Sequence, residues 1–141
     1  NLVVPTGMLY REVLEAAGGL SAEPEKMIAG GPMMGNALFD LDTVVTKTSS
    51  ALLLFRKDPV AEQAVTACIN CGRCAEVCPG RILPARLAVF ADHGAEEQFL
   101  KYHGMECCEC GCCSFVCPAK RQLSQSIKSM RRLLLARRKK G

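Results

Sequence analysis

Ten cysteines lie between Cys68 and Cys117, and eight of them form two runs with one spacing. The runs read CINCGRCAEVCP, starting at Cys68, and CCECGCCSFVCP, starting at Cys107. Each has the pattern C-x2-C-x2-C-x3-C followed by proline. Thiolates at this spacing on a tight loop can each reach a different iron atom of one inorganic cluster. The chemistry that the pattern indicates is therefore iron–sulfur ligation.

This spacing is typical of bacterial ferredoxins, in which the last cysteine of each run ligates the cluster of the other run. We expect two [4Fe-4S] clusters with crossed ligand sets. The first set is Cys68, Cys71, Cys74 and Cys117, and the second is Cys107, Cys110, Cys113 and Cys78. A glycine after the second cysteine, Gly72 or Gly111, would let the backbone pass close to a cluster. The prolines that follow, Pro79 and Pro118, turn the chain away.

Three other uses of cysteine compete with this interpretation. Structural zinc takes four ligands from two C-x2-C pairs, usually with a longer spacer between them. A disulfide framework implies an oxidising compartment, and no secretory segment supports one. Buried structural thiols are the expected role of Cys108 and Cys112, which fit neither ligand register. The two histidines, His93 and His103, stand near helix-ending glycines and are expected to be surface or helix-terminal residues.

Composition favours an ordered protein with an uneven charge. The 141 residues are 49% hydrophobic, which argues against disorder, and no apolar run is long enough to cross a bilayer. The net charge is +4, yet nine of the 18 basic residues lie between Lys120 and Lys140, a stretch without acids. A basic tail on an acidic body points to a partner. The chain opens at Asn1 within a strand-like stretch, so we expect it to be a fragment of a longer protein.

The residues before the first cysteine predict a small α+β domain at 1–56. Strands are expected at Val3-Val4, Lys26–Ala29, Val44–Thr46 and Ala51–Phe55. A helix is expected after Thr6-Gly7, with apolar residues at helical spacing and a stop at Gly18-Gly19. The GGPMMG segment, 30–35, lacks both the dinucleotide-binding and the P-loop spacing. A loop with a close backbone approach is favoured there over a ligand contact.

The elements around the cysteines are expected to be helical. Residues 57–66 read as a linker in which a short helix leads toward Cys68. Between the runs, one helix should begin at Pro84 and stop at Gly94, and a second should cover 95–102 and end by Gly104. The cluster domain is thus predicted at 67–125, as an enlarged, α-helical ferredoxin.

A basic C-terminal helix is predicted at 126–141 as the last domain. Leu123, Ile127, Met130 and Leu134 recur on one helical face. This helix either packs its apolar face on the cluster domain or rests on an anionic membrane surface or an acidic subunit. Nucleic acid is not an expected partner, because aromatic residues make up only 5% of the chain.

The order of several blocks resembles the C subunit of the Rnf-type ion-translocating ferredoxin:NAD⁺ oxidoreductases. The blocks are VPTG, REVLEAAGGL, GGPMMG, VVTKTSSALLLF, CINCGRCAEVCP, ILP and MECCECGCCSFVCPAK, and the match extends to about Ser126. The resemblance implies a soluble-ligand-binding β-grasp (SLBB) domain at 1–56, followed by the α-helical ferredoxin domain. It also implies a peripheral position on the cytoplasmic side of the cell membrane, among the other subunits of the complex.

In that family FMN and NADH bind upstream of these blocks, so no catalytic residue is expected in this chain. The implied function is electron transfer through two [4Fe-4S] clusters in a membrane-associated oxidoreductase that transports ions. One alternative is a fragment of a microcompartment cobalamin reductase, which has the same SLBB and cluster blocks. Another, from a different class, is a zinc-stabilised module that docks subunits.

Overall fold

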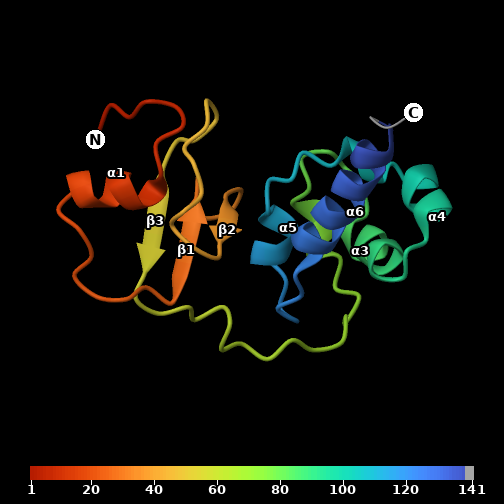
Figure 1. Ribbon diagram of the computed structural model, residues 1–141. Coiled ribbons are helices and arrows are strands. Elements are labelled where there is room, and N and C mark those ends of the chain that lie inside the picture. Colours follow the sequence, from red (N-terminus) through yellow and green to blue (C-terminus); the bar gives the residue numbers. More distant parts are fainter. Residues whose placement is uncertain (139–141) are drawn as a thin grey trace. The chain divides into compact units, whose positions relative to one another are not determined.

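A three-stranded antiparallel sheet and one helix, α1 (Tyr10–Ala16), build the first part of the chain (Figure 1). The structure is a computed structural model that describes residues 1–138. The strands are β1 (Lys26–Ala29), β2 (Asn36–Leu38) and β3 (Leu52–Phe55), in the order β2-β1-β3. In the central strand, Met27 lies opposite Leu38 on one side and Leu54 on the other. The buried core of this part is small and contains Tyr10, Ile28 and Val45.

Local chemistry explains both ends of α1. The Glu12 carboxylate accepts the backbone N–H of Leu9 at 2.8 Å, which satisfies a donor at the start of the helix. At the other end, Gly18 and Gly19 adopt positive φ angles of 103° and 78°, and the Gly19 N–H donates to the Leu14 carbonyl at 2.9 Å. Glycine takes this conformation without a steric penalty, so the pair ends the helix as the sequence predicts.

The expected loop at 30–35 turns the chain from β1 into β2. Gly35 packs so tightly that an added Cβ would lie 2.4 Å from Cγ2 of Ile28 and 2.6 Å from the carbonyl oxygen of Gly31. The close backbone approach predicted for GGPMMG is therefore present. Met33 and Met34 are exposed.

Two of the strands expected from valine pairs are absent, and one strand was not expected. Val3 is fully exposed and the first five residues are irregular. Around Val44 the chain forms a single antiparallel bridge with Leu9 in place of a strand. Conversely, β2 pairs with β1 although Asn36–Leu38 is too short to display an apolar alternation. Pairing partners, which a local apolar pattern does not encode, decide these segments.

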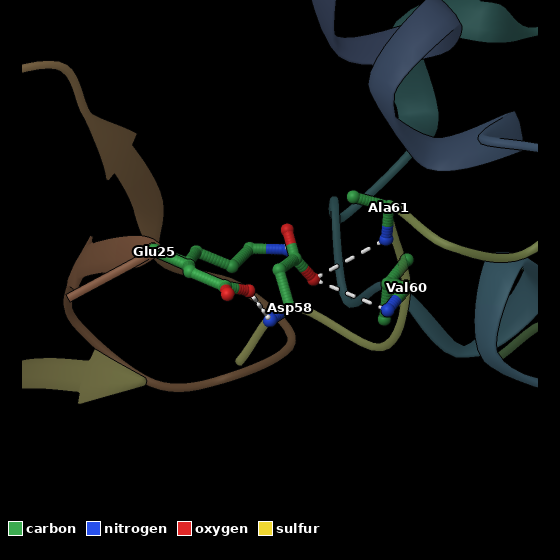
Figure 2. Close-up of polar contacts among 5 residues, drawn as sticks. Glu25, Asp58, Val60 and Ala61 are labelled. Carbon is green, nitrogen blue, oxygen red and sulfur yellow. Dashed lines mark hydrogen bonds and ion pairs between the residues drawn. The ribbon is translucent and has the colours of Figure 1, made fainter. Parts of the chain in front are cut away.

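The linker is irregular, and the prediction of a short helix within it is wrong. Figure 2 shows why the chain turns after Lys57: the carboxylate of Asp58 accepts the backbone N–H groups of Val60 at 3.2 Å and Ala61 at 3.4 Å. The N–H of Asp58 donates to Glu25 at 2.8 Å, and its carboxylate pairs with the Lys26 ammonium at 2.9 Å. An aspartate that satisfies neighbouring N–H groups in this way stabilises a turn at the expense of a helix.

Contacts divide the chain into two compact units, Asn1–Glu62 and the part that begins at Gln63. The second unit is helical. Its main helices are α3 (Pro84–Asp92), α4 (Glu96–Lys101) and α6 (Leu123–Arg138), with a short 3-10 helix, η1, at Gly104–Glu106. The helices expected from Pro84 to Gly94 and from 95 to 102 are thus confirmed as α3 and α4. Two four-residue helices lie inside the cysteine runs, α2 (Arg73–Glu76) and α5 (Cys112–Phe115).

The helix α6 packs against α3 and forms much of the core of the second unit. The four residues of its predicted apolar face are all buried: Leu123, Ile127, Met130 and Leu134. They join Leu87, Ala88 and Phe99 in one cluster. The expected boundary at residue 126 falls inside this helix, whose packing makes it continuous with the cysteine-bearing unit. The end of the basic tail, 139–141, lies outside the described residues.

The cysteine repeat extends to the backbone around the two runs, and α4 and η1 lie between the two copies. A shift of 39 residues carries α2 onto α5 and the start of α3 onto the start of α6. Three pairs of positive φ angles also agree: Asn70 and Glu109 (55° and 57°), Gly72 and Gly111 (79° and 81°), and Arg81 and Lys120 (51° and 54°). Equivalent positions share a rare backbone conformation, so the two halves are structural copies.

Candidate metal centre

The first cavity, of about 160 Å³, gathers four thiols from both cysteine runs. Three come from the loop and helix of the first run, and the fourth follows α5 in the second. They are Cys68, Cys71, Cys74 and Cys117. Ile69, Leu83 and Pro84 supply apolar wall, and Arg86 and Arg121 also line the cavity.

The second cavity mirrors the first and is tighter, about 10 Å³. Five thiols line it, Cys108 and the four of the second predicted set. That set again has three from one run and the last from the other: Cys107, Cys110, Cys113 and Cys78. Ile82 and Ile127 supply apolar wall, and Glu109 and Ser124 add polar groups. All eight cysteines singled out in the sequence are thus brought together, in the two crossed sets that the repeat predicts; their role as ligands stays a prediction.

The donor sets suit an iron–sulfur cluster. Each cavity is lined by the four thiols of one predicted set. Soft thiolate ligands favour iron–sulfur clusters, zinc and monovalent copper over hard cations. All ten cysteines are free thiols. Among residues 1–138, no three or more His, Cys, Asp or Glu side chains form a group that could hold a metal ion. The fit to an iron–sulfur cluster rests on donor chemistry: the four thiols of each predicted set line one cavity.

Backbone conformation places the thiols. Gly72 and Gly111 take left-handed φ angles as the N-caps of α2 and α5, which turns the chain between the second and third cysteine of each run. The Glu109 N–H donates to the sulfur of Cys107 at 3.4 Å. A donor on a ligating sulfur is one of the levers by which a protein tunes a cluster.

Burial sets the protonation of two thiols in the second cavity. The pKa of Cys113 is raised from 9.0 to about 11, chiefly by burial; the nearby thiols Cys107 and Cys110 also raise this pKa, and hydrogen bonds from Ser114 lower it. Burial also raises the pKa of Cys107, while the N–H of Glu109 and the charge of Arg131 oppose that rise. Both groups are protonated at neutral pH when no metal is bound, so metal binding must displace their protons.

An ion-pair network stands beside the second cavity. Arg131 on α6 pairs with Glu109 and donates to the backbone carbonyl of Met105, and the ammonium of Lys128 lies 3.9 Å from Glu109. Beside the first cavity, the guanidinium of Arg121 lies 3.8 Å from the carboxylate of Asp92. Sequence analysis missed these charged groups. Extending the 39-residue repeat beyond its cysteines would have placed Glu109 and Arg121 next to the sites.

The remaining candidates take minor positions. The prediction of a buried structural thiol is wrong for Cys108, which is exposed and lines the second cavity, and Cys112 is half-buried on α5. The ring Nδ1 atom of His93 lies 2.8 Å from the carbonyl of Val89, and that of His103 lies 2.9 Å from the Glu106 carboxylate. Both histidines stand at helix ends, as expected.

Comparison with known proteins identifies the family that the chain resembles. A family model described as a 4Fe-4S binding domain matches residues 65–83. The chain is 38% identical, over its whole length, to the C subunit of the Na⁺-translocating ferredoxin:NAD⁺ oxidoreductase complex of Acetobacterium woodii, of which it covers 32%. It is 39% identical, over 91% of its length, to the C subunit of the ion-translocating oxidoreductase complex of Methanosarcina acetivorans, of which it covers 29%.

A second kind of relative is a cobalamin reductase of Citrobacter freundii. The two proteins are 37% identical over a region that makes up 62% of this chain and 22% of the reductase. The chain therefore spans about a third or less of the curated relatives that it matches. The predicted resemblance to the C subunits of the ion-translocating oxidoreductases is confirmed. The mixture of helices with a small sheet and the match to a 4Fe-4S binding domain agree with the predicted ferredoxin-like fold class. The named relatives are subunits of larger complexes, which agrees with the expectation of partner subunits. Among residues 1–138, none of the helices has both the length and the apolar character needed to cross a membrane.

Proposed function

We propose that this chain is the iron–sulfur segment of the C subunit of an ion-translocating ferredoxin:NAD⁺ oxidoreductase, and that it relays single electrons through two [4Fe-4S] clusters. The observation that carries the proposal is that each cavity is lined by one predicted set of four cysteines, which the last cysteine of the other run completes. Similarity to such a C subunit over the whole chain supports it.

The residues around the cavities have separate roles. Cys68, Cys71, Cys74 and Cys117 would hold the first cluster, and Cys107, Cys110, Cys113 and Cys78 the second. A [4Fe-4S] cluster supplies a centre that accepts and releases one electron without breaking a bond in the protein. Ile82 and Ile127 line the second cavity with apolar side chains, and Leu123 does so in the first. The backbone N–H of Glu109 offers its proton to sulfur at the second site.

The rest of the chain is assigned by the resemblance. Residues 1–56 form an SLBB β-grasp domain in this proposal, with the sheet β2-β1-β3 and α1 as its elements. FMN and NADH bind outside this chain. The protein sits at the cytoplasmic face of the membrane and contacts other subunits of its complex.

Contact with an anionic membrane surface would be electrostatic. The apolar face of α6 is buried within the second unit, so it does not supply an apolar anchor. The basic residues near the end of the helix, Arg132, Arg137 and Arg138 among them, would make the contact. Arg137 also pairs with Glu96.

Cluster content tests the proposal directly. Air-free protein, reconstituted with iron and sulfide, should be brown, contain equal amounts of iron and acid-labile sulfide, and give an EPR signal after reduction. Zinc bound in place of iron, in a colourless protein, would instead identify a zinc-stabilised docking module. The variants Cys71→Ala and Cys110→Ala should each lose half of the iron, while Cys108→Ala, which removes a thiol outside both sets, should lose none.

The cobalamin reductase relative provides a second candidate function, in which the same clusters pass electrons toward a corrin. The two candidates differ in the electron acceptor of the full-length protein. Reduction of a cobalamin by the NADH-reduced full-length protein would favour the second. Reversible exchange with a reduced ferredoxin, without cobalamin reduction, would favour the first.

A further inference from the structure

Many residues that line the two cavities occupy matched positions of the repeat, so the two linings can be compared at those positions. A shift of 39 residues relates Asn70 to Glu109, Ala85 to Ser124 and Ile82 to Arg121, in addition to the cysteines. The same shift relates Arg86, which lines the first cavity, to Gln125. Differences at these matched positions distinguish two sites that share one backbone.

The charged residues that line the first cavity stabilise a negative charge there more than those that line the second cavity do. Arg121 and Arg86 line it. The residues at the matched positions are both neutral: Ile82, which lines the second cavity, and Gln125. At the remaining pair, the first cavity has the neutral Asn70, and the second has the carboxylate of Glu109. All three differences make the wall of the first cavity more positive.

Charges of the opposite sense stand behind the walls. Asp92, which lies 3.8 Å from Arg121, is the counterpart of Arg131, which pairs with Glu109. Lys128, whose ammonium lies 3.9 Å from Glu109, is a second cation behind that wall and corresponds to the neutral Val89. These groups reduce the contrast between the sites. The formal charges of the two sites are then equal, at +1 each, so the contrast that remains comes from distance: the lining groups are nearer to the cavities, and the interaction of two charges falls with distance.

The difference in solvent exposure between the two sets of thiols also favours added negative charge at the first site. Two thiols of the first set, Cys68 and Cys71, are exposed, whereas each thiol of the second set is at least partly covered and Cys113 is 8% exposed. Each added electron makes a thiolate-bound cluster more negative, and burial disfavours added charge.

We infer that the first site has the higher reduction potential of the two and that Arg121 is a positioning residue that raises it. The inference rests on the proposed function. It means that an electron shared by the pair resides mainly at the first site, where exposed thiols face solvent, while the second site is left oxidised. The first site is then the one from which a redox partner collects the electron.

Substitutions that copy one half onto the other test the inference. In an EPR-monitored redox titration of the reconstituted full chain, Arg121→Ile should lower the higher of two midpoint potentials and leave the lower one in place. Glu109→Asn should raise the lower one. Arg121→Lys, which keeps the charge, should retain the original value. Arg137→Gln removes a cation about 20 Å along α6 from Leu123 and should move neither.

The outcomes distinguish a failure of this inference from a failure of the proposed function. Protein with the full iron and sulfide content overturns the inference alone if its two potentials coincide, if Arg121→Ile moves only the lower one, or if Arg121→Lys moves the higher one as far as Arg121→Ile does. Arg121→Gln repeats the measurement if the isoleucine variant folds poorly. Protein that takes up neither iron nor sulfide overturns the proposed function, and this inference with it.

Discussion

At the scale of single residues, Cys113 links burial in the second cavity to the behaviour of the metal-free protein. Its pKa is raised to about 11 in the folded chain, chiefly because burial disfavours the thiolate. Between pH 9 and 11 the unfolded chain has released this proton while the folded chain still holds it. Stability is therefore present in full below pH 9 and is lost as the pH rises toward 11.

We expect this loss to be on the order of 2 kcal/mol in the metal-free protein. Urea unfolding near neutral pH and near pH 11 measures it. Cys113→Ala should flatten the pH dependence, whereas Cys108→Ala, which removes an exposed thiol of the same loop, should leave it steep. An equally steep dependence in Cys113→Ala would contradict the origin assigned here.

Gly104 is a second residue with a sharp steric role. A Cβ at this position would lie 2.3–2.5 Å from ring atoms of Phe99, which is fully buried. Gly104→Ala should cost about 1–3 kcal/mol of unfolding free energy, because the ring has no room to move. Gly80→Ala is the matched control, since its Cβ would meet only the Glu106 carbonyl oxygen at 3.6 Å and the repeat has Ala119 in its place. Comparable losses in the two variants would refute the steric argument.

At the scale of elements, α6 should be the helix on which the second unit depends. Ile127 is fully buried between α3 and the second cavity, and its truncation to alanine should cost about 2–5 kcal/mol. Leu133 on the same helix is 44% exposed, so Leu133→Ala should cost far less. Denaturant unfolding of both variants gives the comparison. A smaller loss for Ile127→Ala than for Leu133→Ala would show that the assigned helix face is wrong.

The turn of the linker gives a prediction for the first unit. The ammonium of Lys26 lowers the pKa of Asp58, mainly through their hydrogen bond. A lowered pKa adds stability above about pH 4 that is lost as the pH falls through the folded-state value. Asp58→Asn should remove this acid sensitivity and about 1 kcal/mol of stability at neutral pH. The acid unfolding curve of the variant, followed by circular dichroism, would contradict the pairing if it matched that of the parent.

Sequence patterns predicted these elements unequally. The stripe from Leu123 to Leu134 and the strand Lys26–Ala29 are long or apolar enough to be detected, and proline and glycine mark α3 at both ends. The short helices α2 and α5 span one turn and have no period to detect. The carboxylate of Asp58, which turns the linker, and the partners of β2 depend on contacts that a local pattern does not contain. Within the sites, cysteine spacing predicted the thiols, and the charged walls became visible only when the cavities were compared.

At the scale of the whole molecule, the two units should separate on proteolysis. Arg56 and Lys57 are exposed at the start of an irregular linker, where a protease can bind the chain. Limited trypsin treatment of the reconstituted protein should cut there first and leave the brown colour with the C-terminal fragment. Colour lost in step with this cut would show that the first unit is needed to hold the clusters.

The central claim is that the last cysteine of each run ligates the cluster of the other run. Paired substitutions test this claim most directly. Cys71→Ala combined with Cys117→Ala removes two thiols of one cavity, so iron and sulfide should fall to half of the parent value. Cys71→Ala combined with Cys78→Ala removes one thiol from each cavity, so both clusters should be damaged and the iron content should fall well below half. If the second pair kept half of the iron and the first pair lost nearly all of it, each run would hold its own cluster and the account would be contradicted.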